Sequence, residues 1–353
     1  MKRLQAVLKS ATCAVLFMAL PSCGSIYDGE ADCSVKVKFV LKKHRQALRA
    51  LDGQGADVFA STVGSVHLFV FDAADGTLVA ERYAETDRLK TEAELNIGTG
   101  DERCYLPLDL AAGTYRLVAW CGLDADGRNN AFSLSGGETR SDAYEECRVL
   151  LSDGQPVHQE KYEALYFGCV ESLTVHPDGS VVPLELTKDN NDIDVWIQHT
   201  SEVFSSGDYE VVYTDANGSM KFADNTLSRD DRCEYRAHTT SLLTTSAEYN
   251  GHPVEAGALV AHLSTARLMA GHAEDARLEV RNREGRTVFS IPFVRYLLEM
   301  QTFTSDGQYY LDCEDSYQCS FYLSGDGQWM PSMIVINNWV RVPDQTDSIG
   351  GES

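Results

Sequence analysis

The segment SVHLFVFDAADG, residues 65–76, decides the fold class of this chain. Every second residue from Val66 to Val70 is aliphatic, which is the pattern of a β-strand that buries one face. Phe69 and Phe71 make the opposite face apolar as well, so we expect this strand to be covered on both sides. The Asp-Gly pair at its end favours a tight turn, because glycine tolerates positive φ angles.

The same alternation of short strands and turns continues along most of the chain. The segment SVKVKFVL, residues 34–41, places Val35, Val37, Phe39 and Leu41 on one face. Further expected strands are rich in the β-branched and aromatic residues that suit a pleated, half-buried surface. They are 114–120, 164–170, 181–187, 192–198, 208–215, 277–282, 287–293, 318–324 and 333–342.

Helical signals are few. They are limited to a short turn within residues 44–62 and two helical turns at 294–301, where Tyr296, Leu297 and Met300 share one side. Many strands without intervening helices argue against a parallel α/β sheet and for β-sandwiches. We therefore predict an all-β fold with few short helices.

A polar interruption at residues 187–191, TKDNN, is the best place for a domain boundary. It divides the chain into expected domains at 33–187 and 188–343, and no sequence repeat of fixed period relates them. Without its first 22 residues the chain keeps about 330, which suits two domains of typical size. The tail at 344–353 is polar and contains glycine, so we expect it to be disordered.

The N-terminus has the organisation of a secretory leader. Three Lys or Arg residues in MKRLQAVLK precede the uncharged run ATCAVLFMAL, which is far shorter than a membrane span. The next residues, Leu20-Pro21-Ser22-Cys23, resemble the lipobox of bacterial lipoproteins, with Pro21 an unusual occupant. We predict a signal peptide at 1–22, cleavage between Ser22 and Cys23, a lipid on Cys23 and a flexible stem at 23–32. The alternative is an ordinary signal peptide that leaves Cys23 as a plain thiol.

A lipid on Cys23 would give stable membrane attachment, since each buried methylene contributes roughly 0.8 kcal/mol and more than one acyl chain is added. The formal net charge of −23 argues against a nucleic-acid partner, because phosphate backbones are bound by clustered Lys and Arg. We therefore expect membrane lipid, and no nucleic acid, among the partners.

The chain contains ten cysteines, and apart from Cys13 and Cys23 they form an even set in a compartment that permits disulfides. No Cys-x-x-Cys pair occurs, which leaves little support for zinc or thioredoxin-like chemistry. Cys104 and Cys121 lie equally far from the Ala112-Gly113 turn signal, so a hairpin closing there would place them opposite one another. We expect a disulfide between them on that ground.

Signals for catalysis or metal binding are weak. The nine histidines are scattered, no Gly-x-Ser-x-Gly elbow occurs, and GLDADGRNN at 122–130 lacks most of a calcium loop and is expected to be a polar turn. We predict no enzyme, no cofactor and no metal site. Trp120, Trp196 and Trp339 lie in apolar strand runs and are expected in the core, whereas Trp329 lies in a loop where it could stack on a sugar.

Several segments together resemble the fimbrillin-A-associated anchor family, the FimB-type minor fimbrial subunits of type V pili. They span nearly the whole chain beyond the leader and follow the order of that family. The segments are SIYDGEADCSVKVKFVL, SVHLFVFDAADGTLV, GTYRLVAWCGL, YEVVYTDANGSMKFADN, ARLMAGHAEDARLEVRNREGRTVFSIPFVRYLL, QYYLDCEDSYQCSFYL and IVINNWVRV.

The resemblance implies two tandem transthyretin-like, Greek-key β-sandwich domains. It also implies a lipoprotein that is exposed at the cell outer membrane, binds fimbrial shaft subunits (fimbrillins) by β-strand addition and limits fimbria length. Shaft subunits resemble precursors that lose their first strand by cleavage after Arg or Lys. A subunit tethered through Cys23 would lose its anchor that way, so we expect its first strand, near Val35 to Leu41, to remain attached and paired.

Two other functions remain open on the sequence. One is a surface glycan-binding lipoprotein of a polysaccharide-uptake system, which would use exposed aromatic residues such as Trp329. The other is an envelope hydrolase, which would need a polar cleft that the sequence does not indicate.

Overall fold

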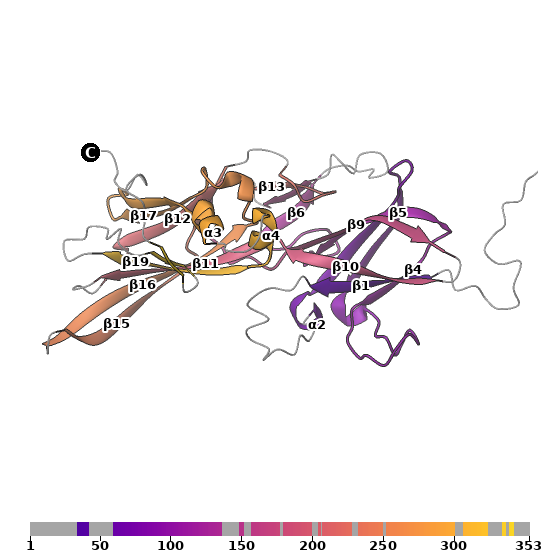
Figure 1. Cartoon of the computed structure of the whole chain (residues 1–353), viewed down its shortest axis with the longest axis horizontal. Coiled ribbons are helices and arrows are strands. Elements are labelled where there is room, and N and C mark those ends of the chain that lie inside the picture. Colours follow the sequence, from indigo (N-terminus) through magenta and orange to yellow (C-terminus); the bar gives the residue numbers. More distant parts are fainter. Residues whose placement is uncertain are drawn as a thin grey trace, which may run out of the picture.

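The protein is described by a computed structural model, which covers residues 34–41, 59–135, 148–151, 157–176, 179–199, 204–205, 207–227, 232–249, 252–300, 306–323, 334–336 and 339–341. The described chain is mostly β-strand, with few short helices, and forms two lobes along one axis (Figure 1). The expected all-β fold of two sandwiches is therefore confirmed. Among the described residues, no helix is long and apolar enough to cross a membrane.

The first lobe is one seven-stranded sheet that folds back on itself, with strand order β3-β2-β5-β9-β10-β1-β4. Two short helical segments, α2 (Phe59–Thr62) and η1 (Thr86–Arg88), interrupt the chain between its strands. The strands are β1 (Ser34–Leu41), β2 (Ser65–Asp72), β3 (Leu78–Glu85), β4 (Tyr105–Asp109), β5 (Gly113–Cys121), β9 (Tyr166–Val175) and β10 (Ser180–Lys188).

Strand β10 is the point at which this sheet folds back on itself. It runs parallel to β1 from Ser180 to Leu186 but pairs with β9 only at its last residues, Thr187 and Lys188. A glycine allows the close approach of β9, because a Cβ at Gly168 would lie 2.2 Å from Leu184 Cδ2 and 2.7 Å from the Glu185 carbonyl oxygen. The two layers therefore face each other across one core.

The core of the first lobe consists mainly of aliphatic residues, many of them from alternate positions of its strands. Val35, Val37 and Phe39 of β1 are fully buried in it, and Leu41 is partly buried against it. The other main contributors are Val66, Leu68, Val70, Leu117, Ala119, Leu184 and Leu186. The alternation in the sequence thus predicts which face of each strand packs inward.

The second lobe is a sandwich of two separate sheets. The larger has the order β15-β16-β11-β19-β20-β21, and the smaller has the order β18-β17-β12-β14-β8. Its strands are β8 (Val157–His158), β11 (Asn190–His199), β12 (Tyr209–Asp215), β14 (Cys233–Arg236), β15 (Thr239–Tyr249), β16 (His252–Ala266), β17 (Arg277–Asn282), β18 (Thr287–Pro292), β19 (Ser316–Leu323), β20 (Ile334–Ile336) and β21 (Trp339–Arg341). Three short helical segments, η3 (Ala270–His272), α3 (Phe293–Glu299) and α4 (Gly307–Asp312), lie between strands.

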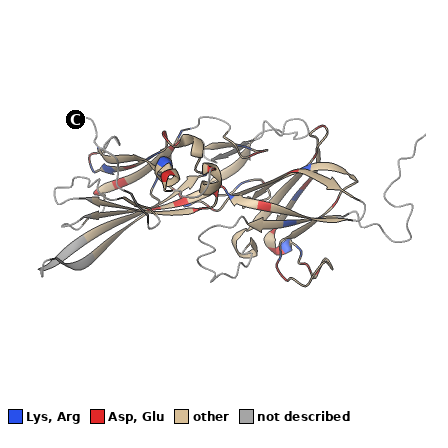
Figure 2. Ribbon diagram, viewed as in Figure 1, with Lys and Arg blue, Asp and Glu red and all other residues tan. Residues whose placement is uncertain are grey.

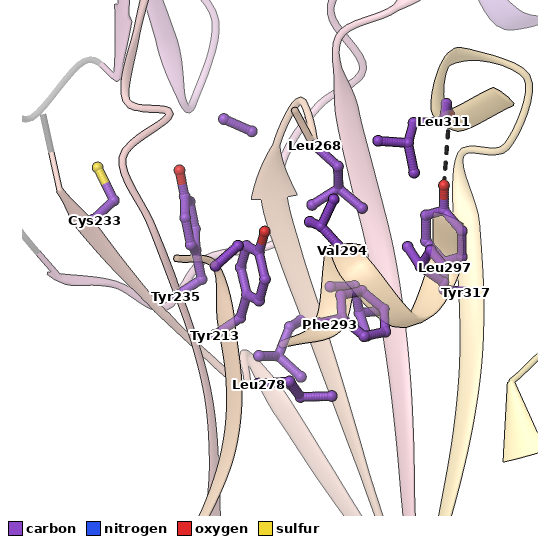
Figure 3. Close-up of a cluster of buried hydrophobic side chains, with 14 of the residues drawn as sticks. Tyr213, Cys233, Tyr235, Leu268, Leu278, Phe293, Val294, Leu297, Leu311 and Tyr317 are labelled. Atoms are coloured by element: carbon purple, nitrogen blue, oxygen red, sulfur yellow. Dashed lines mark hydrogen bonds between the residues drawn. The ribbon is translucent and has the colours of Figure 1, made fainter. Parts of the chain in front are cut away.

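Helix α3 places Phe293, Val294 and Leu297 in the second core, as Figure 3 shows. Phe293 of α3 meets the rings of Tyr213 and Tyr317 edge to face, each at 5.9 Å. The buried phenols find polar partners, since Tyr213 donates to Asp215 Oδ2 at 2.8 Å and Tyr235 donates to Asn217 Oδ1 at 2.6 Å. The predicted helix at 294–301 is therefore confirmed, with its buried side facing this core.

Each lobe contains one long pair of parallel strands. In the first lobe the first strand, β1, pairs in parallel with the last strand, β10. In the second lobe β11 pairs in parallel with β19 over Asp192–His199. The similarity lies in the topology and leaves no repeat in the sequence.

The lobes are joined by strands and side chains that cross between them. Phe222 of the second lobe packs edge to face on Phe69 of β2 at 4.8 Å, and its carbonyl oxygen accepts a hydrogen bond of 3.0 Å from Trp120 Nε1. The second face of β2 is thus covered by the other lobe, as its sequence predicts.

The division at residues 187–191 is less clean than the sequence indicates. Three strands from the expected first domain, β6 (Phe132–Ser135), β7 (Arg148–Leu151) and β8, lie outside the seven-stranded sheet. Strand β7 pairs with β6 and with β13 (Ser219–Lys221), and β8 pairs with β14. Strands β7 and β8 therefore pair with strands that follow the boundary.

Candidate functional site

The expected lipid site, Cys23, lies outside the described residues, and the described chain begins with β1. This strand is an interior strand of the first lobe. It pairs with β10 from Val35 to Leu41 and with β4 from Ser34 to Lys38. The first strand is therefore paired on both sides, and three of its inward residues, Val35, Val37 and Phe39, are fully buried.

The outward face of β1 is held by polar contacts. The Lys38 ammonium lies 5.5 Å from the centre of the Tyr105 ring, and Tyr105 donates a hydrogen bond of 2.8 Å to Glu92 Oε1. Burial lowers the pKa of Lys38, but the hydrogen bond to Tyr105 and the nearby ionisable groups together outweigh burial and raise that pKa overall. These contacts link β1 to β4 in addition to the backbone ladder.

Most sheet edges in the described chain carry features that discourage the addition of another strand, namely charges, prolines or shortness. Strand β3 has three charged residues among its eight, and the five-residue β4 contains Pro107. The part of β10 beyond its contact with β9 contains Pro183 and Glu185. Strand β18 ends at Pro292, β21 has three residues and β8 has two.

Strand β15 differs from these edges. It is eleven residues long and pairs with β16 along its whole length, from Thr239 opposite His262 to Tyr249 opposite His252. The sequence from Thr239 to Ala247, TTSLLTTSA, has no charge and no proline. In Figure 1 the β15–β16 hairpin extends beyond the other strands of its sheet, and in Figure 2 the described part of β15 has neither blue nor red residues.

Two leucines of this edge are exposed. Leu242 and Leu243 are 44% and 45% exposed, although their partners in β16, Leu259 and Ala258, are buried. A strand of high β-propensity with an unprotected edge is a template for a further strand, because its outward backbone groups can hydrogen-bond to another chain. We define Thr239–Ala247 as the open edge. Sequence analysis missed it, although its nine uncharged residues were the available signal.

A polar recess of about 740 Å³ lies at the start of the open edge. His262 Nδ1 is 2.6 Å from Asp194 Oδ1, and the His238 ring stacks at 6.4 Å from the His262 ring. Burial lowers the pKa of His238, and nearby His262 adds to this. Among the described residues no group of three or more His, Cys, Asp or Glu side chains is arranged to hold a metal ion.

A second polar recess, of about 650 Å³, includes the GLDADGRNN segment. Asp124 Oδ1 accepts hydrogen bonds of 2.9 Å from the backbone N–H groups of Asp126 and Arg128. The carboxylate therefore closes its own loop, which agrees with the expected polar turn.

The cysteine hairpin predicted from the sequence is wrong. Strand β4 pairs with β1, while β5 pairs with β2 and β9, so Cys104 and Cys121 are not on neighbouring strands. Both thiols are buried in the first core and are not joined in a disulfide. The prediction fails because the Ala112-Gly113 segment connects two layers of the sandwich instead of closing a hairpin.

The tryptophans are placed differently from one another. Trp120 is fully buried, as expected. Trp196 is only half-buried, because the core face of β11 is formed by Ile193, Val195 and Ile197, so its expected place in the core is wrong. Trp329 and the side chain of Trp339 lie outside the described residues.

A buried polar cluster lies where the chain passes from β10 to β11. Asp189 is fully buried, its Oδ1 accepts a hydrogen bond of 2.5 Å from Asn225 Nδ2, and Arg267 Nε lies 3.8 Å away. Burial raises the pKa of Asp189 to about 7, against the opposing effects of Arg267 and Asn225. Arg267 also makes a two-point ion pair with Asp312, at 2.9 Å and 2.8 Å. The cluster therefore links the β10–β11 junction to the segments that contain Asn225 and Arg267.

Comparison with known proteins places these features in context. The family model of the fimbrillin-A associated anchor proteins Mfa1 and Mfa2 matches residues 30–343. No curated protein sequence matches the chain.

Three solved structures are similar over most of the chain. A putative adhesin from Bacteroides thetaiotaomicron is 25% identical, with a TM-score of 0.71 over 88% of this chain and 97% of that one. Putative polysaccharide binding proteins from the same species are 20% identical, with a TM-score of 0.67 over 90% and 100%. The fimbrial anchor protein Mfa2 from Porphyromonas gingivalis is 17% identical, with a TM-score of 0.59 over 87% and 98%.

Proposed function

The chain belongs to the family of fimbrillin-A associated anchor proteins, and we propose that it holds a fimbria at the outer membrane through a lipid on Cys23 and joins a shaft subunit by β-strand addition at the open edge. The role is mechanical and needs no catalysis. The observation that carries the proposal is that β1 pairs with strands on both sides, whereas β15 pairs, within the described residues, with β16 alone.

The paired first strand supports the proposed attachment through a lipid on Cys23, which we call the tether. A lipid on Cys23 would be separated from β1 by residues 24–33 alone, so force on the lipid would reach the fold directly at Ser34. Removal of β1 would take three fully buried side chains from the first core and sever the tether. Retention of β1 is therefore part of the proposal.

The open edge supports the proposed β-strand addition by a shaft subunit, which we call the joint. The proposed occupant is one extended segment of a neighbouring fimbrial subunit, uncharged where it lies against Thr239–Ala247. An uncharged edge suits such a segment because no lysine or acidic side chain of Thr239–Ala247 would be buried beside it. A second copy of this chain is disfavoured as occupant, since two chains of net charge −23 repel each other.

The tether is tested by Cys23→Ala in the native host. The variant should release the protein and its fimbriae into the medium, because no acyl chain can be attached. Cys13→Ala is the matched control, since it removes a thiol from the leader and leaves the lipobox intact. Fimbriae that stay cell-bound and keep normal length in the Cys23→Ala strain would count against anchoring.

The joint is tested by Leu243→Lys, with Val79→Lys as control. Both residues are exposed on edge strands, at 45% and 48%, but β3 already carries charges. Recovery of shaft subunits with the tagged anchor should fall about tenfold for Leu243→Lys, which corresponds to about 1.4 kcal/mol. Equal recovery with both variants would remove the open edge from the proposal.

A further inference from the structure

We propose that β1 and β11, the strands through which the proposed load would enter each lobe, act as mechanical clamps that resist force applied along the strand from its N-terminal end. This inference rests on the proposed function, because it takes the load to enter at residue 23 and to leave through the second lobe. It adds a property that anchoring alone does not require. The strand order makes the force act along the strands, which is the direction in which a sheet resists separation best.

The register of β1 against β10 sets the direction of loading. Val35, the end nearest the tether, lies opposite Ser180, and Leu41 lies opposite Leu186. The two strands are parallel, so β10 leaves toward β11 at the end of the ladder far from the tether. Tension between the tether and the second lobe therefore slides β1 along β10 instead of peeling it away.

Sliding and peeling differ in how many hydrogen bonds carry the force at once. When a strand is peeled from one end, the bonds break one after another and each carries the full force alone. When it slides, all bonds of the ladder share the force and must fail together. β1 also pairs with β4 from Ser34 to Lys38, so two ladders share the load.

Burial adds to this resistance. Val35, Val37 and Phe39 are fully buried in the first core, and the Phe39 ring stacks on Phe59 at 5.7 Å. Sliding β1 by one residue would turn these side chains toward the outer face, because strand side chains alternate. The core thus opposes the same displacement as the ladders.

The connection from β10 to β11 is a single residue. β10 ends at Lys188 and β11 begins at Asn190, with only Asp189 between them. Asp189 N–H donates to the Leu165 carbonyl oxygen at 2.7 Å, and Asn190 Oδ1 accepts from Leu165 N–H at 3.0 Å. Force on β10 therefore passes directly to β11.

The second lobe receives the force in the same way. β11 enters at Asn190 and is an interior strand, paired with β16 from Asn190 to His199 and with β19 from Asp192 to His199. These ladders are longer than the two that hold β1. We therefore expect the first lobe to be the weaker of two clamps in series.

The test is single-molecule pulling on the full chain from residue 23, made without leader and lipid and held by an N-terminal tag. The second handle is an azide-bearing residue at Val181 in one variant and at Glu185 in the other. Both positions are exposed on β10, opposite Lys36 and Val40 of β1. Val181 loads the ladder by peeling from the tether end, and Glu185 loads it by sliding.

We expect the rupture force through Glu185 to be about twofold higher than through Val181 at equal pulling speed, because forced unfolding follows the unfolding barrier in the direction pulled. Equal melting temperatures of the two variants would show that their folds are matched. A force through Glu185 that does not exceed the force through Val181 overturns the clamp. That result would leave the tether standing, whereas fimbriae retained by Cys23→Ala would refute the tether without changing either force.

Discussion

Phe222 is the side chain whose removal tests how rigidly the two lobes are joined. It is 1% exposed, and its ring packs edge to face on Phe69 at 4.8 Å and on Phe71 at 6.3 Å, both in β2. Truncation of a buried Phe to Ala costs about 3–5 kcal/mol through lost burial and the cavity left behind. The hydrogen bond from Trp120 reaches the Phe222 backbone oxygen and survives the change. We therefore expect Phe222→Ala to lower the free energy of unfolding by about 3 kcal/mol or more.

The matched control is Phe289→Ala, which truncates an equally buried ring that packs on Phe321 at 4.6 Å within the second lobe. Calorimetry with urea unfolding should separate the two variants. Phe222→Ala should split unfolding into one transition per lobe, because it removes contact between the lobes. Phe289→Ala should lower the free energy of unfolding of the second lobe alone. A loss below about 1 kcal/mol for Phe222→Ala, with unfolding unchanged in shape, would refute the reasoning.

Three further predictions concern single sites. The raised pKa of Asp189, about 7 against 3.8 when unfolded, means that its protonated form stabilises the fold at low pH and that this contribution is lost as pH rises through 7. Stability measured in urea should fall by about 3 kcal/mol between pH 5 and 8 from this group, and Asp189→Asn should flatten that slope; an unchanged slope would contradict the assignment. Gly168→Ala should cost about 1–3 kcal/mol in the same assay because its Cβ would overlap β10, while Gly64→Ala, which meets nothing within 4 Å, should not. Burial raises the pKa of the Cys121 and Cys319 thiols, so mass spectrometry should find both unalkylated by iodoacetamide until the protein is unfolded, and rapid native labelling would exclude this burial.

The local sequence pattern was enough to predict the strands but not which strands pair with one another. The alternation in SVKVKFVL and SVHLFVFD predicts β1 and β2 and their buried faces, because the two-residue period is a property of the extended backbone itself. The failed hairpin of Cys104 and Cys121 shows the limit, since equal spacing about a turn signal says nothing of which strands lie in one layer. Trp196 shows the same limit, because its own face of β11 turns away from the core.

The sequence by itself determined the all-β class, the strands with their inward faces and the family resemblance, all of which are written in short contiguous runs. Only the tertiary structure decided that β1 lies between β10 and β4, that Phe222 joins the lobes and that β15 keeps an open edge. The physical reason is that strand pairing is a long-range choice. The backbone groups of every strand are alike, so which partner each receives depends on how whole layers pack around a core.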